Sequence, residues 1–179
     1  RGNSDKEMEF TLIRDDIKIK DVAYTGMVND KTGYILLTRF SRNSAPEMQK
    51  ALTKLKEEKA ESIILDLRNN PGGLLQSSID ILDMLLPKNQ LLLSTKGRTK
   101  GSNRTFYSKR DPIISEDIKL AVLINGGSAS ASEIVSGTIQ DLDRGVIIGK
   151  RSFGKGLVQS VYNLDDKNRL KMTTAKYYI

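Results

Sequence analysis

Three serines alternate with two alanines in the segment 128–133, which reads Ser-Ala-Ser-Ala-Ser-Glu. A serine nucleophile at the start of a helix would have small neighbours that leave room for a substrate, and free backbone N–H groups that stabilise an oxyanion. Ser130 and Glu133 also match a capping box, in which the serine only satisfies the first N–H groups of its helix. The spacing alone leaves both interpretations open.

A catalytic serine needs a general base, and the composition restricts which residue that is. The 179 residues contain no histidine, no cysteine and no tryptophan. Imidazole bases, thiol nucleophiles, disulfides and zinc sites built from His or Cys are therefore excluded. Any acid–base chemistry must come from Lys, carboxylates or Tyr.

Lys155 is the best candidate for that base. It lies in the segment 153–159, Phe-Gly-Lys-Gly-Leu-Val-Gln, where two glycines allow close approach and apolar neighbours favour burial. Burial lowers the pKa of a lysine, because it disfavours the charged form. The alternative is an exposed lysine on a basic loop. Gln159 favours the functional interpretation, because four residues along a strand its amide lies on the same face and can orient Lys155.

Two glycine pairs follow apolar strand patterns, in the segments 70–73 (Asn-Pro-Gly-Gly) and 125–127 (Asn-Gly-Gly). Glycine permits positive φ and lets another backbone come close to exposed N–H groups. Open α/β sheets bind ligands beyond the carboxyl ends of their strands, where both loops lie. Two tight strand-to-helix turns are an equally good interpretation of these residues.

The segment 149–156 matches the phosphate-loop pattern in all but its last position, where Gly156 replaces Ser or Thr. That replacement removes the hydroxyl that binds Mg²⁺. The residues after it, 157–162, have a strand pattern where a phosphate loop must open a helix. An NTPase is therefore disfavoured.

The elements that must position these residues alternate between strand and helix patterns. Strands are predicted at 33–40, 62–67, 90–95, 104–108, 120–124, 145–149, 156–164 and 170–178, and helices at 44–59, 74–85 and 130–142. Short joins between strand, helix and strand predict right-handed parallel crossovers. The last two strands are joined by a polar turn and are expected to be antiparallel. The predicted fold class is α/β with a mixed sheet.

Two further local patterns concern the ends of elements. Ser44 and Glu47 form a capping box for the first helix, with Ser44 as its N-cap. Residues 7–14 alternate like a strand, and Ile17, Ile19 and Val22 extend the apolar period. A strand without an earlier partner suggests the last piece of an upstream domain.

The chain carries 29 basic and 22 acidic residues, for a net charge of +7, and eight of the basic residues fall between Lys88 and Lys119. No aromatic-interleaved strand or basic helix organises these eight charges, which favours a solvated loop over a phosphate-binding patch. No nucleic-acid partner is expected. No apolar run approaches the ~20 residues of a membrane helix, so no integral membrane segment is expected.

Taken together, these motifs resemble those of the carboxy-terminal processing proteases, or tail-specific proteases, a family of serine peptidases with a Ser-Lys dyad. The resemblance runs through 33–35 (Gly-Tyr-Ile), 65–75 (Leu-Asp-Leu-Arg-Asn-Asn-Pro-Gly-Gly-Leu-Leu), 128–134 and 153–159. It implies a crotonase-like or Clp-protease-like core of stacked βαβ units that needs no cofactor or metal.

The resemblance also implies a role for each site residue. Ser130, the middle serine, corresponds to the nucleophile, and Lys155 to the base, oriented by Gln159. The oxyanion donors correspond to the backbone N–H of Ala131 and to that of Gly72 or Gly73. Which glycine donates is left open.

Family members carry a PDZ domain before the protease core. Residues 1–29 are accordingly expected to be the remnant of a PDZ domain with its connecting strand, and residues 30–179 a C-terminally truncated protease core. The implied activity is cleavage of unfolded or tail-exposed proteins near their C-termini, in the periplasm or cell envelope of a bacterium. An oligomer is compatible with the resemblance. The alternative is a catalytically idle peptide-binding or scaffold module of the same fold.

Overall fold

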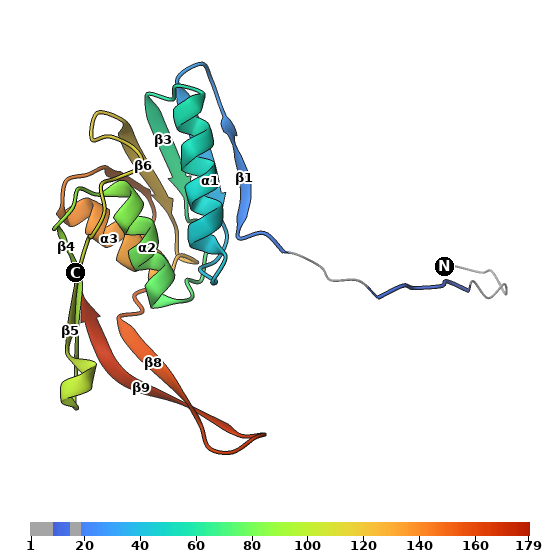
Figure 1. The fold of residues 1–179 in the computed structure, drawn as a ribbon, viewed down its shortest axis with the longest axis vertical. Coiled ribbons are helices and arrows are strands. Elements are labelled where there is room, and N and C mark those ends of the chain that lie inside the picture. The colour runs from blue at the N-terminus through green and yellow to red at the C-terminus, as the bar shows by residue number, and fades with distance from the viewer. Residues whose placement is uncertain (1–8, 15–18) are drawn as a thin grey trace.

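The computed structural model of the protein describes residues 9–14 and 19–179 (Figure 1). Its helices are α1 (Ser44–Glu57), α2 (Leu75–Leu85) and α3 (Ala131–Asp141), with a short 3-10 helix η1 (Lys100–Ser102). Its strands are β1 (Val22–Met27), β2 (Thr32–Leu37), β3 (Ser62–Asp66), β4 (Leu91–Gly97), β5 (Arg104–Tyr107), β6 (Lys119–Ile124), β7 (Val146–Gly149), β8 (Leu157–Asn163) and β9 (Arg169–Tyr178).

The strands form two sheets. The larger sheet has the order β1-β2-β3-β6-β7, in which β1 is antiparallel to β2 and the other neighbours are parallel. The smaller sheet is antiparallel and has the order β5-β4-β9-β8. The predicted α/β class, the mixed sheet and the antiparallel pairing of the last two strands are therefore confirmed.

The apolar core lies between the larger sheet and its helices. Ile35 of β2, Leu65 of β3 and Val122 of β6 are completely buried and lie on successive parallel strands. Helix α1 contributes Met48 and Leu52 to the same core, and α2 packs between α1 and α3 (Figure 1). Each strand-helix-strand crossover thus buries its apolar faces and leaves the loops at the strand ends free for other contacts.

The capping box predicted at Ser44 is wrong. The N-cap of α1 is Asn43, which makes no side-chain cap, and Ser44 is the first helical residue. The Ser44 hydroxyl donates to Asp21 Oδ2 at 2.7 Å, and the Glu47 carboxylate accepts the N–H groups of Asp21 and Val22 at 2.8 and 2.9 Å. These side chains fix the start of β1 against α1, so tertiary partners displace the local cap.

The prediction of a strand at residues 7–14 is wrong for the described part of that segment. Residues 9–14 lie in no strand and extend away from the two sheets (Figure 1). Phe10, Leu12 and Ile13 are 72%, 89% and 89% exposed. A strand needs a paired neighbour, and none of the described elements pairs with this segment. Residues 7, 8 and 17 lie outside the described residues, and the first strand begins at Val22.

Among the helices that the structure describes, none combines the length and the apolarity needed to cross a bilayer.

Candidate functional site

The site lies where the loops after β3 and β6 meet. These strands are parallel neighbours, so the two loops leave the same edge of the sheet. The Asn125 side chain accepts the N–H of Asn69 at 2.9 Å, and the N–H of Ala129 donates to the carbonyl of Asn70 at 3.0 Å. The two glycine-containing loops are therefore bonded to each other directly.

The three alternating serines of the second loop have different environments. Ser128 Oγ donates to the carbonyl of Leu67 at 2.7 Å, and Ser132 Oγ donates to the carbonyl of Asn70 at 2.9 Å. Both side chains are completely buried, whereas Ser130 is half-buried and lines a cavity of about 140 Å³. The outer serines thus fix the loop after β3, and the middle serine faces the cavity.

Ser130 has an unusual backbone conformation, with φ 55° and ψ −110°. Such a conformation in a residue other than glycine costs about 1–3 kcal/mol and persists only where the surroundings impose it. Ser130 is also the N-cap of α3, and its N–H donates to Glu133 Oε2 at 2.7 Å in the predicted capping box. Ser130 therefore both caps α3 and lines the cavity.

Gly72 lies directly behind this turn. A Cβ added to Gly72, whose φ is +89°, would lie 2.5 Å from the Ala129 carbonyl oxygen and 2.9 Å from Ser130 Cβ. Only glycine fits this close approach. The N–H of Gly72 donates to Asn70 Oδ1 at 2.9 Å.

Two other backbone N–H groups at the cavity are free. Gly73 and Ala131 both line the cavity with Ser130, and within residues 9–14 and 19–179 neither N–H has a hydrogen-bond acceptor. Free N–H groups at the first turn of a helix and beside a glycine are suitable donors to a developing oxyanion.

Gln159 reaches the cavity from β8, and Lys155 lies in the loop before that strand. Lys155 Nζ donates a long hydrogen bond of 3.5 Å to Gln159 Oε1. These are the two side chains that the sequence spacing predicts to interact. Gln159 lines the cavity together with Leu157 and Val158, whereas Lys155 is half-buried and its side chain is joined to the cavity through Gln159. Residues 157–163 form strand β8, as predicted, so no helix follows the phosphate-loop-like segment.

Glu133 joins the Ser130 turn to the Lys155 loop. Its Oε2 accepts the N–H groups of Ser130 and Lys155 at 2.7 and 2.8 Å, and its Oε1 accepts the Ser152 hydroxyl at 2.8 Å and the Gly154 N–H at 2.5 Å. Burial raises the pKa of Glu133, but these four hydrogen bonds outweigh it and lower the pKa below its ordinary value. The carboxylate is thus ionised while it holds both segments.

Tyr177 of β9 makes a second link between the same segments. Its hydroxyl donates to the carbonyl of Lys155 and, at 3.3 Å, to that of Ser130, while its N–H donates to the carbonyl of Gly156 at 3.1 Å. Burial raises the pKa of Tyr177, and the nearby charge of Glu133 raises it further, so the hydroxyl stays a donor. Sequence reasoning identified Glu133 only as a helix cap and did not identify Tyr177.

The strand that leads into the first loop ends in an ionic cluster. Asp66 is 1% exposed and accepts the Tyr34 hydroxyl at 2.6 Å and the Arg68 guanidinium at 2.6 Å. Burial raises the pKa of Asp66, but the hydrogen bonds from Arg68 and Tyr34 have the larger, opposite effect. The pKa of Asp66 therefore lies below its ordinary value. The cluster anchors the chain immediately before the asparagine and glycine residues of the site.

Comparison with known proteins identifies relatives over most of the chain. Residues 31–179 match Peptidase family S41. The chain is 42% identical over 182 residues to a carboxy-terminal-processing protease of Bartonella bacilliformis, covering 99% of this chain and 41% of that protein. It is 41% identical over 172 residues to a carboxyl-terminal-processing protease of a Synechocystis strain, covering 94% of this chain and 39% of that protein.

A solved structure agrees with these relatives. The photosystem II D1 C-terminal processing protease superimposes with a TM-score of 0.76 at 32% sequence identity, over 92% of this chain and 45% of that one. The chain spans about two fifths of the length of the curated relatives, at 41% and 39%. From the match over residues 31–179 and the identity to these proteases, we conclude that the chain belongs to peptidase family S41, whose members are serine peptidases.

Proposed function

We propose that the protein is a serine endopeptidase that cleaves proteins near their C-termini, with Ser130 as nucleophile, Lys155 as general base and Gln159 orienting the lysine. One observation carries this proposal. Ser130, in its strained turn, lines the same cavity as two free backbone N–H groups and as Gln159, which is hydrogen-bonded to Lys155.

In the proposed mechanism, neutral Lys155 accepts the proton of Ser130 as the serine oxygen attacks the carbonyl carbon of the scissile bond. The resulting oxyanion accepts hydrogen bonds from backbone N–H groups at the cavity. When the intermediate collapses, the carbon–nitrogen bond breaks and the lysine returns its proton to the leaving amine. A water molecule then hydrolyses the acyl-enzyme by the same proton transfers.

The oxyanion donors in this proposal are the N–H groups of Ala131 and Gly73. Both line the cavity, and neither has another acceptor among the described residues. Gly72 is less suitable because its N–H already donates to the Asn70 side chain at 2.9 Å. Its close contact with Ser130 gives it a steric role instead.

The wider context of the site is also a proposal. We place the protein in the periplasm or cell envelope of a bacterium, and its substrates are unfolded or tail-exposed proteins. Two bacterial relatives with C-terminal processing in their names support the bacterial source and the class of substrate. Residues 1–29 would be the remnant of a PDZ domain with its connecting strand, and β1, which pairs with β2, would be that connecting strand.

The test is cleavage of an unfolded protein that ends in an apolar tail, followed by mass spectrometry of the products. Ser130→Ala and Lys155→Ala should each lower the cleavage rate by at least about a thousandfold. Lys150→Ala is the matched control, because Lys150 is an exposed lysine five residues before Lys155.

A Ser130→Ala variant that cleaves as fast as the parent would disprove the proposed role of Ser130. The scaffold alternative makes a different prediction. It requires that the parent bind the tail but neither cleave it nor become labelled at Ser130 by a serine-reactive phosphonate.

A further inference from the structure

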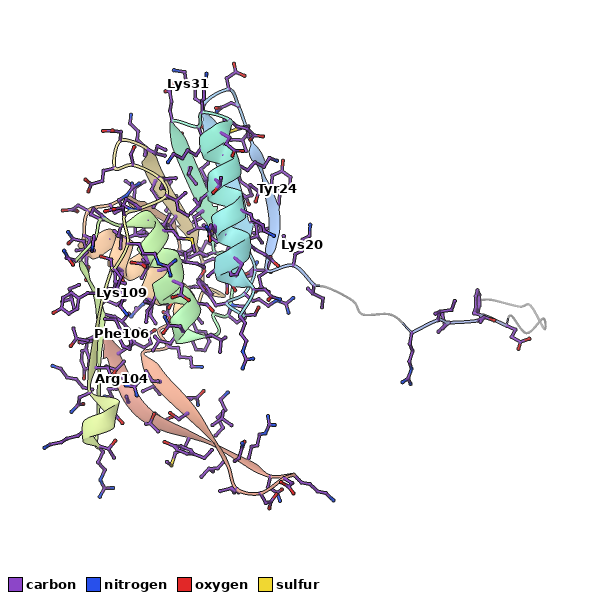
Figure 2. The ribbon with its side chains drawn as sticks, in the orientation of Figure 1. Lys20, Tyr24, Lys31, Arg104, Phe106 and Lys109 are labelled. Carbon is purple, nitrogen blue, oxygen red and sulfur yellow. The ribbon has the colours of Figure 1, made fainter. Side chains whose placement is uncertain are left out.

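A second cavity, of about 310 Å³, lies next to the cavity of Ser130. The two cavities share Leu75, at the start of α2, and Val158 of β8, so they adjoin along one groove. The wall of the second cavity comes from both hairpins of the smaller sheet. Figure 2 shows two of its residues, Arg104 and Phe106, on β5.

Among the described residues that line this cavity, Arg104 alone carries a charge. Arg104 is exposed, and its Nε donates to the Gly101 carbonyl at 3.2 Å, which leaves the terminal nitrogens of the guanidinium available. In the part of the chain that the structure describes, Arg104 forms no ion pair, whereas Arg110 in the same basic stretch pairs with Asp83 at 3.8 Å. The cavity therefore has a positive charge without a partner.

The remaining polar groups of the wall are mostly bonded to each other. Thr95 Oγ1 donates to the Ser102 carbonyl at 2.8 Å, and the hydroxyls of Ser160 and Thr174 lie 2.9 Å apart. These bonds define the shape of the wall and leave the Arg104 guanidinium as the main group available to a ligand. A guanidinium binds a carboxylate through two parallel hydrogen bonds, and no acidic side chain of the wall competes.

We infer that this cavity is a subsite for a carboxylate of the substrate, bound by Arg104. The inference rests on the proposed function, because it needs a peptide that passes Ser130 and continues over Leu75 and Val158. The carboxylate is either the C-terminal carboxylate of the substrate or the side chain of an aspartate or glutamate. Binding of the terminal carboxylate here places the scissile bond a short distance from the end of the substrate, which gives cleavage near C-termini a physical cause.

The test uses two pairs of peptides. The first pair has one sequence with either a free C-terminal carboxylate or a C-terminal amide, and the second has either Glu or Gln at an internal position, with an amidated end. In one of the two pairs, the parent should cleave the peptide with the carboxylate at a kcat/KM about tenfold above that of the neutral peptide, because its KM is lower. Arg104→Ala should reduce that ratio to about one. Arg98→Ala should keep the ratio of the parent, because Arg98 is exposed on the same hairpin but does not line the cavity.

Binding of the same peptides to the Ser130→Ala variant, measured by fluorescence anisotropy, separates this inference from the proposed function. If the parent cleaves nothing but the bound peptides still show the carboxylate preference, and Arg104→Ala removes it, then the proposed function fails and the subsite stands. A preference that survives Arg104→Ala, or no preference in either pair, overturns the subsite and leaves the roles of Ser130 and Lys155 untouched.

Discussion

Replacing Glu133 by glutamine tests whether its charge holds the site together. The amide has nearly the same shape as the carboxylate, but one of its terminal atoms becomes a donor. If the NH₂ group takes the place of Oε2, it points at the N–H groups of Ser130 and Lys155, which lie 2.7 and 2.8 Å away. Donors then face donors, and both N–H groups lose their acceptor. If the NH₂ group takes the place of Oε1, it can donate to the Ser152 hydroxyl, and only the N–H of Gly154 loses its acceptor. The second orientation is therefore the less costly one.

The cost of this better orientation follows from its hydrogen bonds. Two bonds to Oε2 remain but lose the charge of their acceptor, which weakens each by about 1 kcal/mol, and the lost bond from Gly154 adds about 1 kcal/mol. Because Glu133 is only partly buried, solvent screening reduces this sum to about 2 kcal/mol. Looser placement of the Lys155 loop should also lower kcat by roughly ten- to a hundredfold.

The assay combines urea denaturation with steady-state kinetics corrected for the fraction of active sites. The pKa of Glu133 is lowered from 4.5, so its contribution to stability is present above that pH and is lost as the pH falls through the lowered value. The stability difference between parent and Glu133→Gln should therefore shrink below pH 4.5. Ser152→Ala, which removes one hydroxyl and keeps the charge, should change kcat by about threefold or less. If the Glu133→Gln variant has the same kcat and the same stability as the parent at neutral pH, the charge of Glu133 does not hold the site together.

Three further changes test other contacts of the site. Tyr177→Phe removes the hydroxyl that bonds the carbonyls of Lys155 and Ser130, so kcat should fall about tenfold at an unchanged KM; a rate equal to the parent's would contradict a positioning role. Asp66→Asn should lower the free energy of unfolding by about 2–3 kcal/mol in urea denaturation, because it removes the charge that pairs with Arg68; a loss below ~0.5 kcal/mol would contradict this. Gly72→Ala should lower kcat by at least roughly a hundredfold, because its Cβ would lie 2.5 Å from a backbone oxygen; parent kinetics would show that the turn can move.

The fold was predictable because its signals are local. Each strand-helix-strand unit shows its own apolar period. Lys155 and Gln159 are close enough in sequence to be paired by inspection, although Lys155 lies in the loop before β8 rather than in the strand. Local patterns fail where a distant partner competes. Ser130 and Glu133 form the capping box that their spacing predicts, whereas Ser44 and Glu47 have the same spacing and bind Asp21 instead.

Long-range contacts account for what the sequence does not reveal. The hydroxyl of Ser152 that bonds Glu133 lies 19 residues away in the chain, and Tyr177 lies 47 residues from Ser130. No periodicity joins positions so far apart, so only the folded chain shows that Glu133 and Tyr177 connect the two halves of the site. The same holds for the proposed preference for Gly73 over Gly72 as oxyanion donor, which rests on a hydrogen bond from the Gly72 N–H to the Asn70 side chain.

The position of Tyr177 also determines when the site is completed during biosynthesis. A ribosome makes Ser130 and Lys155 before it makes β9, and β9 supplies the hydroxyl that bonds the carbonyls of both residues. A nascent chain that ends before residue 177 therefore lacks this link, even though the strand-helix units of the larger sheet are already complete. The order of synthesis thus makes the hydrogen bonds from Tyr177 to the Ser130 and Lys155 segments among the last contacts of the site to form.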